Sequence, residues 1–432
     1  MANSDDQTYY VIPLSVQREG EAYYIGNAEL GEFYEFPEDG LRIVERLQAG
    51  DSVGAIKRAL AARTADGADA GGANTDSANT EGANASGEIA AGAGVAETVD
   101  VDDFLAQLRE IGFILPPHER DAYQRRVDES AAGDRRLSFR ANTALARALF
   151  SPATLALYVG VLAYAGYSAW LDPRLRPNLQ AFYLEQHLTL TLVALLGLYF
   201  VTTMLHELGH MLAAARYGVS SRLGIGNRLW DLVAEADLTG ILSLPRRQRY
   251  LPLLAGMMID VLNIALLSLA VGWLLDHGGN AFVVQLLQAL VLQLLITLSW
   301  QLNIFLRTDF YYVVCNYFGH PDLDQQARLY LRDRLHRFSG GRIGAAAAPG
   351  ALVPRNLGVL RAFSLLWVAG RISALALLAF VLIPTLTRYI VRAYDIFASP
   401  AATRAAALDA TAFAAISVAL FAAGMYLWLR RR

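Results

Sequence analysis

The sequence predicts a mainly α-helical, polytopic membrane protein with a small α+β domain at its N-terminus. Of its 432 residues, 54% are hydrophobic and 18% are charged, whereas a soluble globular chain is about 45–50% apolar and about 25% charged. After residue 150 the chain contains apolar runs that are each near the roughly 20 residues needed to cross a bilayer core. The first 118 residues lack such runs, which favours a soluble domain there.

Residues 1–118 are expected to form this N-terminal domain. Two extended runs flank a turn at Gly20, and this pattern predicts a β-hairpin. Leu41, Val44 and Leu47 then recur at helical spacing. The predicted elements are the hairpin within 9–27 and helices within 37–50, 51–63 and 99–114.

Two further segments separate the predicted helices. Residues 62–98 alternate Ala, Gly, Asn, Asp and Thr and contain no large apolar side chains. Such a segment buries too little surface to offset the entropy lost on ordering, so we expect a disordered insertion at 62–98. Residues 119–150 are rich in arginine and are expected to be a basic linker to the membrane domain, residues 151–432.

The membrane domain is predicted to contain six transmembrane helices. The alternative for these runs is a large soluble helical core, but their lengths and the near absence of charge favour a membrane. The spans are expected at about 152–171, 187–213, 250–274, 281–305, 360–386 and 410–429.

The arginines predict how these spans are oriented. Arginine is concentrated before the first span, between spans two and three, between spans four and five, and in the C-terminal tail. Because cytoplasmic loops carry the excess of basic residues, both termini and the N-terminal domain are expected to be cytoplasmic. We therefore expect an integral membrane protein, with the lipid bilayer as a partner and no nucleic-acid partner.

A metal-binding pattern lies near the inner end of the second span. His206 and His210 are separated by one helical turn, so both lie on one face and can share a metal ion. Glu207 between them would then stand beside the activated water as a general base. The alternative is a set of polar side chains that reach toward the interface from a helix end. Three polar residues in an apolar helix are costly unless they are paired or functional, which favours the metal site.

A third ligand is expected from the end of the fourth span. The only cysteine is Cys315, so a cysteine-based zinc site is excluded and the ligands must be histidines and carboxylates. Asp309 follows the apolar run of span four, and spans two and four both run toward the cytoplasm. This topology brings Asp309 to the depth of the two histidines, and a His₂-carboxylate set suits Zn²⁺. The alternative for Asp309 is an exposed interfacial acid after Arg307.

These motifs carry a family resemblance. "HELGH" (206–210) with an Asp at the end of a later span resembles the site-2-protease class of membrane-embedded zinc metallopeptidases. The closer resemblance is to the bacterial branch of peptide zinc metalloproteases, whose third-ligand motif reads N-P-L-L-R-F-D-G-Y-Y. Residues 303–312 read "NIFLRTDFYY", with Ile304 in place of the proline and Phe310 in place of the glycine. The sequence leaves open whether turnover survives these two departures.

The resemblance implies a role for each matching residue. His206, His210 and Asp309 would bind the metal, and Glu207 would be the catalytic base and acid. Asn303 would donate a hydrogen bond to the substrate carbonyl or oxyanion.

Residues 244–263 also resemble that branch, with an acidic residue in the third span. This residue is Asp260, near the middle of its span. It is expected either to bind a ligand histidine or relay protons, or to hold two helices together through a polar contact.

The N-terminal domain is similar in pattern to PqqD-like domains, which are winged-helix modules. The resemblance implies binding of a leader peptide as an added strand, and hence a leader-peptide or export partner. The alternative is a structural cap on the membrane domain.

Together these patterns predict hydrolysis of a peptide bond in a membrane-associated peptide or protein, in the maturation or export of a ribosomally made peptide. Two alternatives remain at this stage. One is a regulatory protease that cuts a transmembrane signalling protein, and the other is a catalytically inactive membrane scaffold or peptide carrier.

Overall fold

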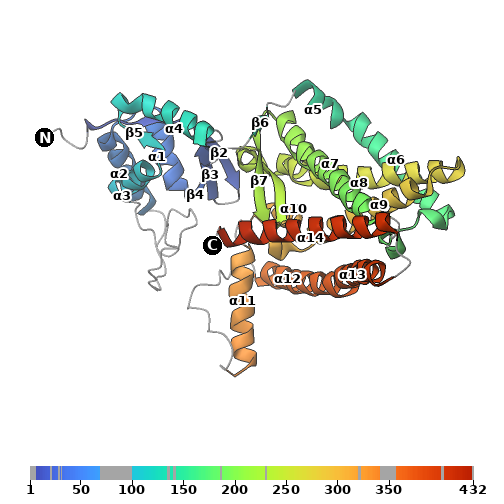
Figure 1. The fold of residues 1–432 in the computed structure, drawn as a ribbon. Helices are drawn as coiled ribbons and strands as arrows, with labels where there is room; N and C mark the ends of the chain where they lie inside the picture. The colour runs from blue at the N-terminus through green and yellow to red at the C-terminus, as the bar shows by residue number, and fades with distance from the viewer. Residues whose placement is uncertain are drawn as a thin grey trace. The chain divides into compact units, whose positions relative to one another are not determined.

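The computed structural model shows a chain of two compact units (Figure 1). One unit comprises Met1–Arg136, Val219–Ser221 and Asp237–Arg249, and the other comprises Leu137–Gly218, Arg222–Ala236 and Tyr250–Arg432. The structure describes residues 6–19, 22–27, 30, 32–68, 100–133, 137–139, 143–184, 187–228, 231–319, 323–340, 357–399 and 403–430.

Among its described residues, the first unit combines two small antiparallel sheets with four helices. Strands β1 (Tyr10–Val11) and β5 (Ile114–Leu115) pair, and β2 (Ser15–Glu19), β3 (Ala22–Asn27) and β4 (Glu32–Phe36) form a meander. The pairing of Glu19 with Ala22 confirms the predicted hairpin. The helices are α1 (Glu38–Gln48), α2 (Val53–Ala68), α3 (Val101–Glu110) and α4 (Arg120–Gly133), with the 3₁₀ turn η2 (Pro117–Glu119) before α4.

The core of this unit lies between the strands and helices. The apolar face predicted for α1 is buried: Leu41, Val44 and Leu47 all belong to the core. Phe36 of β4 meets the edge of the Phe104 ring of α3, with ring centroids 5.7 Å apart.

Helix α2 is longer than the sequence pattern predicts. It continues to Ala68, which is inside the segment expected to be disordered, because its last turns are rich in alanine, the strongest helix former. The rest of that predicted insertion, up to residue 98, lies outside the described residues.

The segment expected to be a basic linker contains regular structure. Helix α4 buries Tyr123 in the core of the first unit, and Arg126 donates to the Gly112 carbonyl at 3.0 Å. Helix α4 has few apolar residues, and they are interspersed with arginines in the sequence. Composition alone therefore indicated a linker. The same segment holds β6 (Leu137–Phe139) and α5 (Thr143–Leu149) of the second unit.

The second unit confirms six apolar helices at the predicted positions. Each is long and apolar enough to cross a membrane, yet only 6% to 33% of the residues in their apolar windows are buried inside the molecule. The helices are α6 (Pro152–Leu171), α7 (Leu188–Arg216), α8 (Arg246–Asp276), α9 (Ala281–Gln301), the continuous α12–η8–α13 and α14 (Arg404–Arg430).

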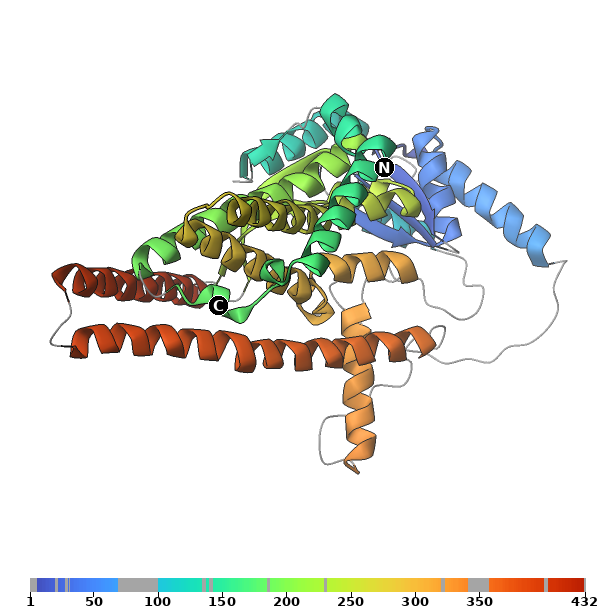
Figure 2. The same cartoon turned by 90° about the vertical axis from the view of Figure 1, so that its right-hand side faces the viewer.

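The fifth of these helices is much longer than predicted. Helix α12 (Leu357–Leu377) continues through the π-helical turn η8 (Leu378–Leu382) into α13 (Ile383–Ala398), and Figure 2 shows one unbroken helix. Its candidate span, Gly358–Ala398, has 41 residues, about twice what a bilayer core requires. Helix α11 (Leu323–Phe338) runs across the direction of α12 in both views.

The remaining elements of this unit join the long helices. Strands β7 (Ser221–Arg228) and β8 (Asp231–Asp237) complete a sheet in the order β6-β7-β8. The 3₁₀ turns η3 (Pro173–Leu175) and η4 (Leu179–Phe182) precede α7, and η5 (Thr239–Ser243), which belongs to the first unit, precedes α8. The 3₁₀ turn η6 (Ile304–Leu306) and α10 (Asp309–Phe318) follow α9.

Helix α7 is held at both ends by other elements of the second unit. At its N-terminus, the Asp409 carboxylate of α14 accepts hydrogen bonds from the backbone N–H groups of Leu188 and Thr189, at 2.8 and 3.1 Å. At its C-terminus, Arg216 donates to the Phe150 carbonyl. The first four N–H groups of a helix lack intrahelical partners, so Asp409 supplies from a distant helix the cap that the local sequence lacks.

We therefore expect Asp409→Ala to lower the free energy of unfolding by about 1 kcal/mol, the usual effect of losing a helix cap. Unfolding of the detergent-solubilised protein in sodium dodecyl sulfate, followed by circular dichroism, measures this. The exposed Asp395 of α13 provides the control Asp395→Ala, and an equal loss in both variants would contradict the capping role.

Candidate metal centre

The two histidines of the HExxH motif converge on one point. Helix α7 places them one turn apart, and both are buried, with 7% of His206 and 2% of His210 exposed. Their Nε2 atoms are 3.1 Å apart. Two imidazole nitrogens this close in an apolar surrounding need either a shared proton or a shared cation.

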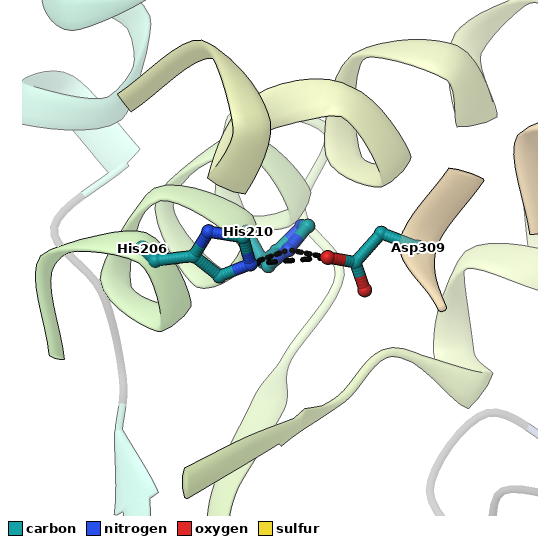
Figure 3. Close-up of side chains that lie close together, drawn as sticks. All are labelled: His206, His210 and Asp309. Carbon is teal, nitrogen blue, oxygen red and sulfur yellow. Dashed lines mark hydrogen bonds and ion pairs between the residues drawn. The ribbon is translucent and has the colours of Figure 1, made fainter. Parts of the chain in front are cut away.

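Asp309 completes the group from a distant part of the chain. Its Oδ2 atom lies 3.0 Å from Nε2 of His206 and 3.5 Å from Nε2 of His210, and Figure 3 shows the carboxylate pointing at both rings. The three ligand atoms therefore converge although Asp309 is 103 residues from His206. Spans two and four are predicted to run in the same direction, and that arrangement requires Asp309 to lie near the two histidines.

The spacing of these atoms fits a metal ion. Zinc–nitrogen and zinc–oxygen bonds of about 2.0–2.1 Å in tetrahedral geometry give distances of about 3.3 Å between ligand atoms. The observed separations of 3.0, 3.1 and 3.5 Å lie around this value. The His206–His210–Asp309 group could thus hold a metal ion with three protein ligands.

Helix α8 orients both imidazole rings. The Nδ1–H group of His210 donates to the Pro252 carbonyl at 2.7 Å, since a carbonyl oxygen can only accept. The Nδ1 atom of His206 lies 2.8 Å from Oδ2 of Asp260, which is 3% exposed. These bonds leave both Nε2 lone pairs facing Asp309, as in metal sites whose histidines donate their other N–H to a carboxylate or carbonyl. Of the two roles expected for Asp260, the geometry favours the hydrogen-bond partner of a ligand histidine.

Gly256 is a site residue that the motif analysis did not single out. A Cβ atom at this position would lie 2.3 Å from Nε2 of His210 and 2.5 Å from Nε2 of His206. Pro252, Gly256 and Asp260 are spaced four residues apart, so one stripe of α8 faces the histidines. The sequence feature that could have indicated Gly256 is its position one helical turn before Asp260, the acidic residue in the middle of the predicted third span.

The segment before Asp309 is tightly folded. Arg307 has φ 53° and is the single non-glycine residue with positive φ among the described residues. The Thr308 hydroxyl donates to the Gln301 carbonyl at 2.6 Å, and the Gln301 side chain accepts from the Asp309 N–H at 3.2 Å. These bonds turn the chain back against the end of α9, which fixes where α10 begins and hence where Asp309 lies.

The Asp309 carboxyl is kept in its ionised form. Burial raises the pKa of this carboxyl, but protonated imidazoles of His206 and His210 lower it by more through hydrogen bonds and charge, so that the net pKa lies below the ordinary value. A carboxylate is the form in which an aspartate binds a metal.

Glu207 does not belong to the group of convergent ligand atoms. Its Oε2 atom accepts a hydrogen bond from the backbone N–H of Ala236 in β8 at 2.8 Å. The side chain is half-buried. One carboxylate oxygen is therefore held by the sheet, directly beside the ligand histidines in sequence.

Asn303 lies at the start of the turn that leads to Asp309. It is 1% exposed, and neither of its amide atoms has a hydrogen-bond partner among the described residues. It does not belong to the group of convergent ligand atoms. A buried amide without a partner costs about 1–3 kcal/mol.

The two residues that depart from the resembled third-ligand motif, Ile304 and Phe310, both pack in an apolar cluster. Ile304 is buried in an apolar cluster with Tyr311 and Phe363, and Phe310 packs against the same cluster. Both side chains thus fill the core between α10, α11 and α12.

Comparison of the chain with protein-family models, with curated proteins and with solved structures finds no match. The function must therefore be argued from the chemistry of the site itself.

We expect Gly256→Ala to abolish metal binding, because the added methyl group would occupy the space between the two Nε2 atoms. Metal content of the purified protein, measured by mass spectrometry of the elements, tests this. Gly272→Ala in the same helix is the matched control, since a Cβ there meets only Leu175 at 3.5 Å. Full metal occupancy in the Gly256 variant would contradict the site.

Asp260→Asn keeps the shape of the side chain but removes the charge beside His206. Loss of such a partner lowers metal affinity by about 10–100-fold. Competition with a chelator of known affinity measures the change. Asp276→Asn at the exposed end of α8 should have no effect, and equal affinities in the two variants would show that Asp260 only joins helices.

Proposed function

We propose that this protein is an integral membrane zinc metallopeptidase that hydrolyses a peptide bond in a membrane-associated peptide or protein. The observation that carries the proposal is the convergence of His206, His210 and Asp309 within 3.0–3.5 Å, with Glu207 next to the ligands on α7. Two histidines and a carboxylate leave a fourth position of a tetrahedral ion open, as catalytic zinc sites do.

The surface of the second unit supports the membrane location. Large apolar side chains are exposed along all six long helices, and a surface of this extent is stable only in an apolar medium. The distribution of arginines supports cytoplasmic termini, and the resemblance of the HExxH and Asp309 motifs to a bacterial branch supports a bacterial inner membrane. Because α7 would then run inward, its histidines would lie near the cytoplasmic face.

The donor set supports zinc. Imidazole nitrogen and carboxylate oxygen suit Zn²⁺, and a site without sulfur ligands disfavours the softer copper(I) ion. Bound zinc would supply Lewis acidity toward a carbonyl group and toward water.

The side chains of the site would manage protons and orientation. Glu207 would accept a proton from the attacking water and pass it to the leaving amine. The Ala236 N–H that holds Oε2 would keep this carboxylate from rotating. Asn303, whose amide has no partner among the described residues, would donate from Nδ2 to the substrate carbonyl oxygen.

The first unit would recruit the substrate. It is a separate α+β unit with its own core and a three-stranded meander, which supports a PqqD-like, winged-helix module for a leader peptide. The enzyme would then act in the maturation or export of a ribosomally made peptide.

Glu207→Gln is the decisive variant. We expect it to retain zinc at the level of the unaltered protein but to lower peptide hydrolysis by about 10²–10⁴-fold, the contribution of a positioned general base. Quantitative proteomics of membranes from the two strains would reveal the uncleaved precursor that accumulates. Asp309→Ala should lose both zinc and activity, and Asp395→Asn should lose neither.

The same comparison separates the proposal from its rival. Unchanged processing in the Glu207→Gln strain would indicate a peptide carrier or scaffold that keeps the metal site without turnover. A transmembrane signalling protein as the accumulated precursor would indicate a regulatory protease.

A further inference from the structure

A charged side chain lies well inside the fifth candidate span. Arg371 of α12 is exposed, and it stands about 20 Å along the helix from Gly358 at 1.5 Å per residue. A cation at this depth of an apolar segment is costly and usually marks the path of a substrate or an ion.

Two aromatic rings hold the Arg371 guanidinium. Its Cζ atom lies 4.2 Å from the ring centroid of Trp367 and 4.7 Å from that of Phe305. Stacking of this kind orients the planar group but leaves the N–H groups at its edge free to donate. The rings therefore position the cation without neutralising it.

Among the described residues, Arg371 lacks the acidic partner that Arg328 and Arg337 have. Arg328 and Arg337 form ion pairs with Asp324 and Asp333, each at 2.9 Å. Within the part of the chain that the structure describes, no carboxylate comes within ion-pair distance of Arg371. An acidic partner of Arg371 would therefore come from outside the described residues.

The position of Arg371 connects it to the candidate metal centre. Phe305 belongs to η6, four residues before Asp309. Gly370 approaches Asn303 so closely that a Cβ atom would lie 3.1 Å from Asn303 Oδ1. Arg371 thus flanks the segment that carries both the amide without a partner and the third metal ligand.

We propose that Arg371 binds a carboxylate of the substrate, so that the substrate class is a membrane-associated peptide with an acidic side chain or a free C-terminus near the cleaved bond. The guanidinium fork matches a carboxylate through two parallel hydrogen bonds. The inference rests on the proposed peptidase function, since it assigns the substrate of that site. A lipid phosphate is the rival occupant, and the position of Arg371 beside Phe305 and the Asn303 segment favours the peptide.

A binding assay tests this without hydrolysis. The full-length Glu207→Gln protein is placed in nanodiscs of zwitterionic phosphatidylcholine. The probes are dansyl-labelled trileucine with a free C-terminal carboxylate, its C-terminal amide, and dansyl-Leu-Asp-Leu amide. Fluorescence titration should show the carboxylate probe or the aspartate probe binding at least about tenfold more tightly than trileucine amide, as a charge-assisted hydrogen bond provides.

Substitution assigns that preference to one residue. We expect Arg371→Gln to bind the charged and uncharged probes equally, while its zinc content stays normal and so reports an intact fold. Arg361→Gln, in the same helix and also exposed, should keep the preference. The two charged probes show whether a side chain or a C-terminus is the ligand.

Several results would overturn the inference. These are no binding of either charged probe, no preference in the parent protein, or a preference that persists in Arg371→Gln. Loss of co-purified phosphatidylglycerol as the sole effect of Arg371→Gln would identify a lipid contact and also refute it. Because no cleavage is measured, a failed peptidase proposal and a failed carboxylate site remain distinguishable: a carrier would still show the preference.

Discussion

The close contact between α7 and α8 is the constraint on which the site depends. Buried imidazoles are costly in an apolar surrounding unless every polar atom is paired, and one stripe of α8 pairs them. This requires the helix backbones to approach without intervening side chains. A Cβ at Gly256 would strike both Nε2 atoms, and one at Gly209 would lie 2.8 Å from Ile259. Two glycines thus allow the contact that Pro252 and Asp260 then use.

The third ligand depends on a different set of contacts. Arg307 holds an unfavourable left-handed conformation two residues before Asp309, and such strain persists only where surrounding structure enforces it. Asp324 of α11 helps to enforce it: this buried carboxylate lies 3.7 Å from Nε of Arg307 and accepts from Trp367 Nε1 at 3.1 Å. Helices α11 and α12 therefore determine where the chain turns toward the histidines.

A few polar contacts position the long helices in the same way. In a lipid surrounding, apolar side chains provide little driving force between helices, so close packing and interhelical hydrogen bonds set their register. Here Asp409 caps α7, Asp260 joins α8 to α7, and the Tyr389 hydroxyl donates to the Phe182 carbonyl. The single contact between Asp260 and His206 thus both orients a candidate metal ligand and joins two helices.

The sequence alone determined the six apolar helices and the pairing of His206 with His210, because span length and helical spacing are local properties. It also indicated Asp309, through a topology inferred from arginines. Only the tertiary structure decided that Gly256 lies against both histidines, that Asp260 faces His206, and that Ile304 and Phe310 pack in an apolar cluster. The sequence pattern also did not predict that α2 continues to Ala68 or that α4 buries Tyr123. The physical reason is common to these residues: each depends on which faces of separate elements meet, and periodicity along one element carries no information about its neighbour.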